Sequence, residues 1–300
     1  MSTDKASQKV LITGATGQLG RALLAAVPGN IVARGVTHAE LNIADQGSVQ
    51  SLVSEFAPDL IINAAAYTAV DKAETDASAA EQVNVLGPRN LALAARALSS
   101  QGNTAVRLLH VSTDFVFDGA ASRAYQPGDP CAPLGVYGQT KQAGERAVLD
   151  ILGKQASIVR TAWVYDATGK NFLRTMLRLM NERGAVRVVS DQIGTPTAAH
   201  SLAEMLWRCA TTSVAGIYHW TDAGVASWYD FAVAIAEEAV VMGLLPAMPQ
   251  ILPIATTEYP TPARRPAFSV LDKSASYAAL GLTPVHWRVR LREVMTQVRL

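Results

Sequence analysis

The chain has 300 residues, of which 49% are apolar, with 26 basic and 25 acidic residues. This length allows one large α/β domain, alone or with a smaller lobe. The near-neutral balance lacks the basic excess typical of proteins that bind nucleic acid or membrane surfaces, so we expect neither partner. The two cysteines, Cys131 and Cys209, form no CxxC pair, so the sequence indicates neither a disulfide framework nor a metal site.

The amino-terminal segment MSTDKASQ is short and polar. No positively charged stretch leads into an apolar run, so we expect a disordered leader and not a signal peptide. No later stretch approaches the roughly 18 uninterrupted apolar residues that a membrane span needs. The expected location is therefore the cytoplasm.

Short apolar strands alternate with helical segments through the first half of the chain. The expected strands are 9–14, 30–34, 59–66, 106–113 and 157–162. The expected helices between and after them are 19–27, 47–56, 78–100 and 137–152. This alternation predicts an α/β fold with a parallel sheet covered by helices on both faces. Right-handed crossovers then give a Rossmann-like, doubly wound sheet.

The second half of the chain is less regular. We expect helices at 170–182, 200–211, 227–242 and 287–298, and strands near 185–190 and 216–220. Six prolines between positions 246 and 266 favour a surface loop with extended pieces over a long helix. We therefore expect residues 1–165 to be mainly a dinucleotide-binding domain. Residues 166–300 should be mainly a substrate-binding lobe, packed closely against it and able to return strands to its sheet.

A glycine-rich loop follows the first expected strand, in the segment KVLITGATGQLG. Glycines at this spacing permit a tight turn and let backbone N–H groups approach a pyrophosphate, which the next helix N-terminus also favours. The alternative is an ordinary strand-to-helix turn, but the flanking strand and helix favour dinucleotide binding. The candidate cofactor-binding residues of this loop are Gly14, Thr16, Gly17, Gln18, Leu19 and Gly20.

The end of the second expected strand bears on the choice between NADH and NADPH. An acidic residue there would bind the ribose hydroxyls of NAD, whereas this segment carries Arg34 and no acid. An arginine fork suits a 2′-phosphate, so we expect NADPH or NADH with NADPH favoured. The alternative for Arg34 is a solvated surface residue, which leaves use of both cofactors open.

Tyr137 and Lys141 lie four residues apart, on one face of an expected helix. A lysine ammonium near a phenol favours the phenolate and so lowers the tyrosine pKa, which would let Tyr137 exchange a proton with a carbonyl oxygen. Such pairs also occur by chance on helix surfaces. Here the preceding strand ends in Ser112–Thr113, and hydroxyls at the carboxyl end of a parallel strand can hold a substrate carbonyl. The alternative for these hydroxyls is strand-end capping.

This combination resembles the extended short-chain dehydrogenase/reductase superfamily. Asn63–Ala64–Ala65–Ala66 resembles its cofactor-lining N-A-A loop, which implies that Ala64, Ala65 and Ala66 contact the cofactor. Leu41–Asp45 resembles the segment beside the adenine, which implies contacts from Asn42 and Ile43, although Asn42 replaces the usual acid. The helix segment Asn84–Gly87 also matches.

Within the superfamily, the chain resembles the dTDP-4-dehydrorhamnose reductase branch. The matching segments are NAAAYTAVDKAE (63–74), VSTDFVFDG (111–119), PLGVYGQTK (133–141), RTAWVY (160–165), DQIGTPT (191–197) and ARRPAFSVLD (263–272). The resemblance implies a nucleotide-sugar substrate whose 4-keto group is reduced by NADPH or NADH. The implied catalytic residues are Thr113, Asp114, Tyr137 and Lys141.

In that reaction Tyr137 supplies the proton, Thr113 positions the oxygen, and Lys141 tunes Tyr137 and holds the nicotinamide ribose. The resemblance further implies that Trp163 contacts the sugar or its pocket and that Arg264 or Arg265 contacts the diphosphate. The alternatives are core packing for Trp163 and a position in a solvated loop for the arginines. The implied substrate-binding residues are Thr113, Asp114, Phe115, Trp163, Arg264 and Arg265.

Phe115 separates this chain from related sugar 4,6-dehydratases, which carry a glutamate there for the elimination. Other nucleotide-sugar epimerases and ketoreductases stay open as alternatives. So does a non-catalytic regulatory role, as in the regulatory beta subunit of methionine adenosyltransferase, which resembles this branch. Some relatives form dimers with Mg²⁺ held by carboxylates at the contact. The sequence leaves the oligomeric state open, with a homodimer as one alternative. Arg21 directly follows the glycine loop, so the sequence predicts no such metal site here.

Overall fold

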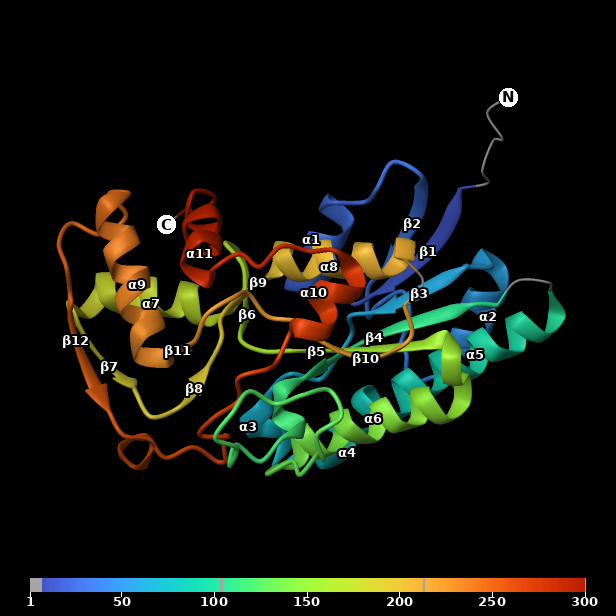
Figure 1. Cartoon of the computed structure of the whole chain (residues 1–300), viewed down its shortest axis with the longest axis horizontal. Coiled ribbons are helices and arrows are strands. Elements are labelled where there is room, and N and C mark those ends of the chain that lie inside the picture. Colours follow the sequence, from blue (N-terminus) through green and yellow to red (C-terminus); the bar gives the residue numbers. More distant parts are fainter. Residues whose placement is uncertain (1–6, 103–104, 213, 300) are drawn as a thin grey trace.

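The computed structural model describes residues 7–102, 105–212 and 214–299, so residues 1–6 of the expected leader lie outside the described part. Its central layer is a parallel sheet of six strands in the order β10-β5-β4-β3-β1-β2 (Figure 1). These strands are β1 (Gln8–Thr13), β2 (Ile31–Val36), β3 (Leu60–Asn63), β4 (Arg107–Thr113), β5 (Ala156–Thr161) and β10 (Gly216–His219). The predicted doubly wound α/β fold is confirmed.

Helices cover both faces of this sheet, because alternate strand residues point to opposite sides. Leu11, Ile61 and Leu108 pack with the helices of one face, whereas Val10 and Ile62 pack with those of the other. The first face carries α2 (Gln46–Phe56), α5 (Gly87–Gln101) and α6 (Val136–Leu152). The second carries α1 (Gln18–Ala25), α8 (Ala199–Thr212) and α10 (Ser274–Leu280).

The helix predicted over 78–100 is divided. It consists of α4 (Ala77–Glu81), a π-helical turn (Gln82–Leu86) and α5. Pro88 accounts for the division, since a proline donates no backbone hydrogen bond and its ring would clash with the carbonyl four residues earlier. That carbonyl belongs to Asn84, which lies within the π-helical turn. A short helix that the sequence did not predict, α3 (Val70–Ala73), precedes this region.

A second group of elements forms its own core around Phe231, on the left of Figure 1. Its helices are α7 (Phe172–Arg183), α9 (Trp228–Val241) and α11 (Trp287–Met295), beside the parallel pair β7 (Ala185–Val189) and β12 (Gln250–Ile254). Strand β12 lies in the proline-rich region, where extended pieces were predicted. Four two-residue strands form two further pairs, β6 (Val164–Tyr165) with β9 (Thr197–Ala198) and β8 (Ile193–Gly194) with β11 (Ala226–Ser227). Strands β6, β9 and β11 contribute residues to the core of the second group.

The chain beyond residue 165 is not confined to this second group. Strand β10 pairs with β5 at the edge of the central sheet, and α8 and α10 pack on one face of that sheet. None of the helices in the described parts of the chain is both long and apolar enough to cross a membrane.

Two predicted strand ends were wrong, and both lie near the glycine loop. Strand β2 continues to Val36 because it stays paired with β1 as far as Thr13. Strand β3 stops at Asn63, three residues earlier than predicted. Beyond it the chain leaves the sheet, and its backbone passes close to Gly14.

Candidate active site

The glycine loop leaves β1 in a conformation that requires glycine. Gly14 has φ +71°, and a Cβ there would lie 2.8 Å from the backbone nitrogen of Ala65. Gly17 is the N-cap of α1, and a Cβ at the buried Gly20 would lie 2.7 Å from the Cα of Ala15. Glycine at these positions therefore lets β1, the loop and α1 approach one another closely. This tight turn into a helix N-terminus is the arrangement that fits a bound pyrophosphate.

The other candidate residues of the loop lie at the start of α1. The Thr16 carbonyl accepts a hydrogen bond from Arg21, and Leu19 is buried in the core. The Gln18 side chain accepts a hydrogen bond of 2.8 Å from Asn171 Nδ2, at the start of α7. The glycine loop is therefore attached directly to the second group of elements.

The residues predicted to line the cofactor beyond β3 and to lie beside its adenine have distinct surroundings. Ala64, Ala65 and Ala66 are half-buried just beyond β3. Asn42 is exposed, and its side-chain oxygen accepts a hydrogen bond from the Ala44 backbone. The Ile43 side chain is buried in the core, so any contact of Ile43 with a cofactor would come from its backbone.

Arg34 does not lie at the end of its strand. It pairs with Leu11 in the register of β1 and β2, two residues before β2 ends. Its guanidinium forms a 3.2 Å ion pair with Glu55 of α2 and lies 5.7 Å from the Phe56 ring centre. A contact with a 2′-phosphate would require this guanidinium to leave Glu55.

Three candidate residues form a tight turn after β4. Thr113 Oγ1 accepts a hydrogen bond from the Phe115 backbone at 3.2 Å and donates to Asp114 Oδ1 at 3.1 Å. Asp114 is 2% exposed, and burial raises its pKa to about 6, although hydrogen bonding from Ser269 and Thr113 opposes the rise. The turn therefore holds a carboxyl group that changes its charge close to neutral pH.

Helix α6 begins against this turn and brings Tyr137 to it. A side chain at Gly138 would overlap the Phe115 carbonyl, so glycine allows the close approach. The Tyr137 and Phe115 rings meet edge to face at 5.6 Å between centres. Desolvation raises the pKa of Tyr137 to about 12, and the neighbouring Thr113 hydroxyl opposes this only in part.

The predicted lowering of the Tyr137 pKa by a neighbouring ammonium is therefore not found. Lys141 lies one helical turn beyond Tyr137 and is 1% exposed. Its Nζ donates a 2.7 Å hydrogen bond to the Val111 carbonyl, and burial lowers its pKa to about 8. Tyr137 is thus held as a neutral phenol, which is the form that can donate a proton.

Several buried polar atoms near this turn lack a hydrogen-bond partner among the described residues. They are Ser112 Oγ, Asp114 Oδ2 and Thr161 Oγ1, at the carboxyl ends of β4 and β5. Unpaired buried polar atoms are costly in a folded protein and often mark a functional site. Their position agrees with the rule that ligands of doubly wound sheets bind beyond the carboxyl ends of the strands.

Trp163 follows β5 and has the strained backbone angle φ +48°. Its indole stacks on Trp228 of α9, with ring centres 3.5 Å apart and planes inclined by 9°. Its other neighbour is Gly194, where a Cβ would lie 2.7 Å from the indole. Strain of this kind in a bulky residue persists only where the surroundings hold it in place. The stack extends from the strand end to the second group of elements.

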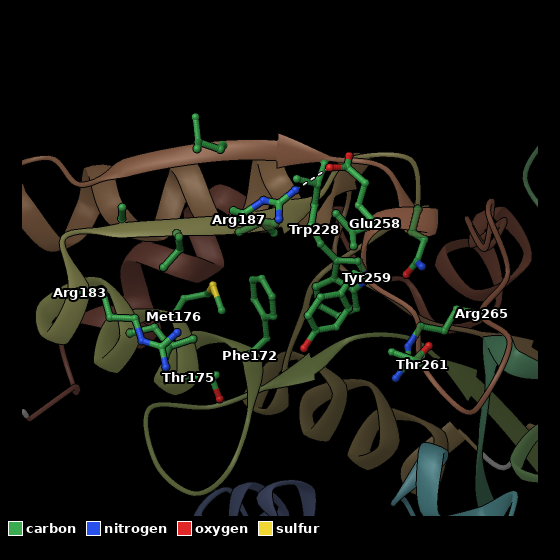
Figure 2. Close-up of a pocket in the computed structure, with 18 residues that line it drawn as sticks. Phe172, Thr175, Met176, Arg183, Arg187, Trp228, Glu258, Tyr259, Thr261 and Arg265 are labelled. Atoms are coloured by element: carbon green, nitrogen blue, oxygen red, sulfur yellow. Dashed lines mark hydrogen bonds and ion pairs between the residues drawn. The ribbon is translucent and has the colours of Figure 1, made fainter.

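A cavity of about 840 Å³ lies on the far side of that stack, among α7, β7, β12 and the segment 256–265. Figure 2 shows Phe172, Trp228 and Tyr259 projecting into it, with Arg183 and Arg265 towards opposite ends. Its volume is within the usual range for small-molecule sites.

The two candidate arginines of the 263–272 segment differ in their surroundings. Arg265 lines the cavity and forms a two-point ion pair with Asp71 of α3, at 2.8 and 3.1 Å. Arg264 is exposed. The structure therefore brings Arg265, but not Arg264, to the cavity wall.

Sequence reasoning missed several residues of this region. Trp228 and Phe172 lie in predicted helices and carried no distinguishing signal. Asp71 lies within the family-matching segment 63–74 but was not singled out. Asn63 was noted only within a family motif, and His110 is a lone polar residue in an apolar strand. A buried polar position inside a continuous apolar run is the one available signal for His110.

A family model described as the RmlD substrate binding domain matches residues 8–300. A dTDP-4-dehydrorhamnose reductase of Aggregatibacter actinomycetemcomitans is 43% identical over 294 residues, covering 95% of this chain and 98% of the relative. A dTDP-4-keto-6-deoxy-D-glucose reductase of Streptomyces niveus is 40% identical, covering 94% and 95%. The crystal structure of dTDP-4-dehydrorhamnose reductase from Bacillus anthracis in complex with NADP superposes with a TM-score of 0.90. It is 34% identical and covers 97% of this chain and 100% of that chain.

Proposed function

The chain belongs to the RmlD substrate binding domain family, and we propose that it reduces the 4-keto group of dTDP-4-dehydro-6-deoxy-L-mannose to give dTDP-L-rhamnose. It is an NAD(P)H-dependent oxidoreductase, as its named relatives are reductases and a solved relative binds NADP. The observation that carries the proposal for the reacting group is the position of Tyr137. Its phenol lies against the turn after β4. This turn is at the carboxyl-terminal edge of the parallel sheet, where the glycine loop also leaves β1.

When bound, NADPH or NADH supplies the hydride that is added to the sugar C4 carbon. The carbonyl oxygen then gains a proton from Tyr137, whose raised pKa keeps it protonated until an alkoxide develops. Thr113 positions that oxygen, and Lys141 holds the ribose on the cofactor side. Hydride and proton together convert the ketone to an alcohol, and no metal is needed for this step.

Phe115 argues against dehydration as the reaction. An elimination needs a second acid or base near the sugar, and Phe115 places an aromatic ring against Tyr137 where a carboxylate would be required. Asp114 is then the one acidic side chain of the turn Asp114–Val116. This composition favours the reductase over the related dehydratases.

The cavity beside Trp228 is suited to the nucleotide end of the substrate. Aromatic side chains offer stacking surfaces for a base. Arg265 has a fork that matches phosphate oxygens, and a contact with a diphosphate would require it to leave Asp71. The chain runs from Arg265 at the cavity to Ser269, whose hydroxyl lowers the pKa of Asp114. Four residues span at most about 14 Å, which lets one diphosphate-linked sugar reach from the cavity to Tyr137.

We expect Arg265→Ala to raise the KM for the nucleotide sugar by about 10- to 100-fold, since hydrogen bonds to a charged group are lost. Affinity for NADPH should stay unchanged. Arg264→Ala is the matched control and should leave both constants close to wild type, because Arg264 is exposed. Steady-state kinetics with varied sugar nucleotide checks both variants. The reverse pattern would assign the diphosphate contact to Arg264.

For cofactor choice we expect Arg34→Ala to weaken NADPH binding by about 10-fold or more while NADH binding changes little. Glu55→Gln is the control, because it releases the guanidinium from its ion pair and should leave NADPH binding equal or tighter. Fluorescence titration of both cofactors measures this. Equal losses for NADPH and NADH in Arg34→Ala would rule out a 2′-phosphate contact.

The reaction itself is tested by supplying dTDP-4-dehydro-6-deoxy-L-mannose with NADPH and following the loss of nicotinamide absorbance. The D-gluco 4-ketosugar is included because one relative is named for that substrate. Isomerisation without net cofactor oxidation would indicate an epimerase. Tight cofactor binding without turnover of either sugar would indicate a regulatory protein.

Three further statements stay predictions. We expect a cytoplasmic location, a homodimer, and a division of labour in which residues 1–165 mainly bind the dinucleotide and 166–300 mainly bind the substrate. Light scattering coupled to size-exclusion chromatography checks the dimer.

A further inference from the structure

A row of polar side chains crosses three strands just below the candidate site. Thr13 of β1 is in register with Asn63 of β3, which is in register with His110 of β4. Neighbouring residues at the same level of a parallel sheet point to the same face, here the face that α6 covers. All three side chains are at most 1% exposed, and Lys141 of α6 lies at the end of the row.

The hydrogen bonds of Asn63 fix the orientation of its amide. Asn63 Oδ1 accepts from Thr13 Oγ1 at 2.7 Å and from the Ala65 backbone N–H at 3.2 Å. The Ala65 N–H can only donate, so the side-chain oxygen, and not the nitrogen, must face it. Asn63 Nδ2 therefore points to His110 Nδ1, 3.0 Å away, and donates to it.

This orientation determines the tautomer of His110. Burial holds the pKa of His110 well below its usual value, so the imidazole is neutral and carries one proton. Because Nδ1 accepts from Asn63, that proton is on Nε2. Nε2 lies 3.3 Å from Lys141 Nζ. An N–H group thus faces the lysine nitrogen, and only a neutral amine has a lone pair to accept it.

We propose that His110 is a positioning residue that acts through Lys141: its Nε2–H, held towards the amine by Asn63, favours the neutral amine over the ammonium. The neutral amine can accept from His110 while donating to the Val111 carbonyl, which satisfies both contacts. The ammonium could also donate to the Val111 carbonyl, but its remaining N–H groups would face the Nε2–H of His110, so two donors would meet without an acceptor. Lys141 therefore changes its charge near neutral pH and is not a permanent cation.

The other charged or titratable groups near Lys141 do not account for this behaviour. Glu145, one turn further along α6, raises the lysine pKa, and its carboxylate is paired with Arg160 of β5 at 2.7 Å. Tyr137, on the same helix, is neutral because its pKa is raised to about 12. Asp114, after β4, would favour the ammonium when ionised. Only desolvation and His110 favour the neutral amine.

The test is an NMR titration of protein labelled with ¹³C in its lysine side chains, with Lys141→Arg identifying the resonance. We expect Lys141 to titrate at or below about 8, and His110→Phe to move this midpoint up by about one unit, the value of one hydrogen bond. His219→Phe is the matched control, since His219 is also buried but bonds to the Tyr125 carbonyl. It should leave the midpoint unchanged.

An unchanged or lower midpoint in His110→Phe would overturn the proposal, because a His110 that accepts from the ammonium predicts a downward shift. The wild-type protein gives a second measurement that does not depend on how the variant folds. ¹⁵N spectra of His110 should show a protonated Nε2 and an unprotonated Nδ1, and the opposite tautomer would contradict the proposal.

The consequence for turnover rests on the proposed function. If Lys141 acts at the reaction centre, His110→Phe should shift the pH profile of kcat/KM in the same direction as the NMR midpoint. An expected NMR shift in a protein without reductase activity would remove the proposed function and leave the assignment for His110 standing. If the protein is an active reductase but His110→Phe does not raise the Lys141 midpoint, the proposed function stands and the assignment for His110 is wrong.

Discussion

Replacing Tyr137 with phenylalanine should lower kcat by about 100- to 10,000-fold, the usual contribution of a positioned general acid. The substitution removes one oxygen and keeps the ring, so the edge-to-face contact with Phe115 is retained. Affinity for NADPH and the KM for the sugar nucleotide should change little, because the lost interaction develops with the alkoxide. Pre-steady-state absorbance at saturating substrate measures the chemical step directly.

Tyr218→Phe provides the matched control for this experiment. Tyr218 is a half-buried tyrosine on β10, outside the turn that holds Thr113 and Asp114. Its variant should turn over at the wild-type rate. A Tyr137→Phe protein with normal kcat would remove Tyr137 from the proton transfer and direct attention to Asp114, whose pKa of about 6 also permits proton exchange.

Gly20→Ala should weaken NADPH binding by at least about 100-fold, equivalent to roughly 2.7 kcal/mol. The added Cβ would overlap the Gly14 carbonyl and lie 2.7 Å from the Cα of Ala15. Both are backbone atoms, so the overlap can be relieved only by moving the loop away from α1. Such a movement displaces the backbone N–H groups on which a pyrophosphate would depend.

Gly29→Ala is the matched control, since a Cβ at Gly29 meets no atom within 4 Å. It should bind NADPH like wild type, with stability unchanged or slightly increased. Isothermal calorimetry for binding and a thermal melt of each free protein separate loss of the site from loss of the fold. Normal NADPH affinity in Gly20→Ala would contradict the assignment of this loop.

The sequence predicted most of the central sheet because its strands are continuous apolar runs and its helices are amphipathic. The glycine loop and the Tyr137–Lys141 pair were also predictable, since each is a local pattern with a chemical reason for its spacing. The break at Pro88 was readable in principle from the proline. The end of β2 was not, because pairing with β1 extends the strand past Gly35.

Tertiary contacts explain what the sequence did not predict. The Asp71–Arg265 ion pair joins residues 194 positions apart, and the Trp163–Trp228 stack joins two separate elements. The expected effect of Lys141 on the Tyr137 pKa assumed a solvated ammonium. Lys141 is buried and Tyr137 is half-buried, and desolvation penalises the charged form of each.

The central claim, reduction at the sugar C4 carbon, is tested most directly with NADPH deuterated at the transferred position of the nicotinamide C4. The enzyme is supplied with dTDP-4-dehydro-6-deoxy-L-mannose, and the product is analysed by NMR and mass spectrometry. We expect one deuterium per product molecule, located at C4 of the sugar. Product without deuterium, or with deuterium at another carbon, would contradict it.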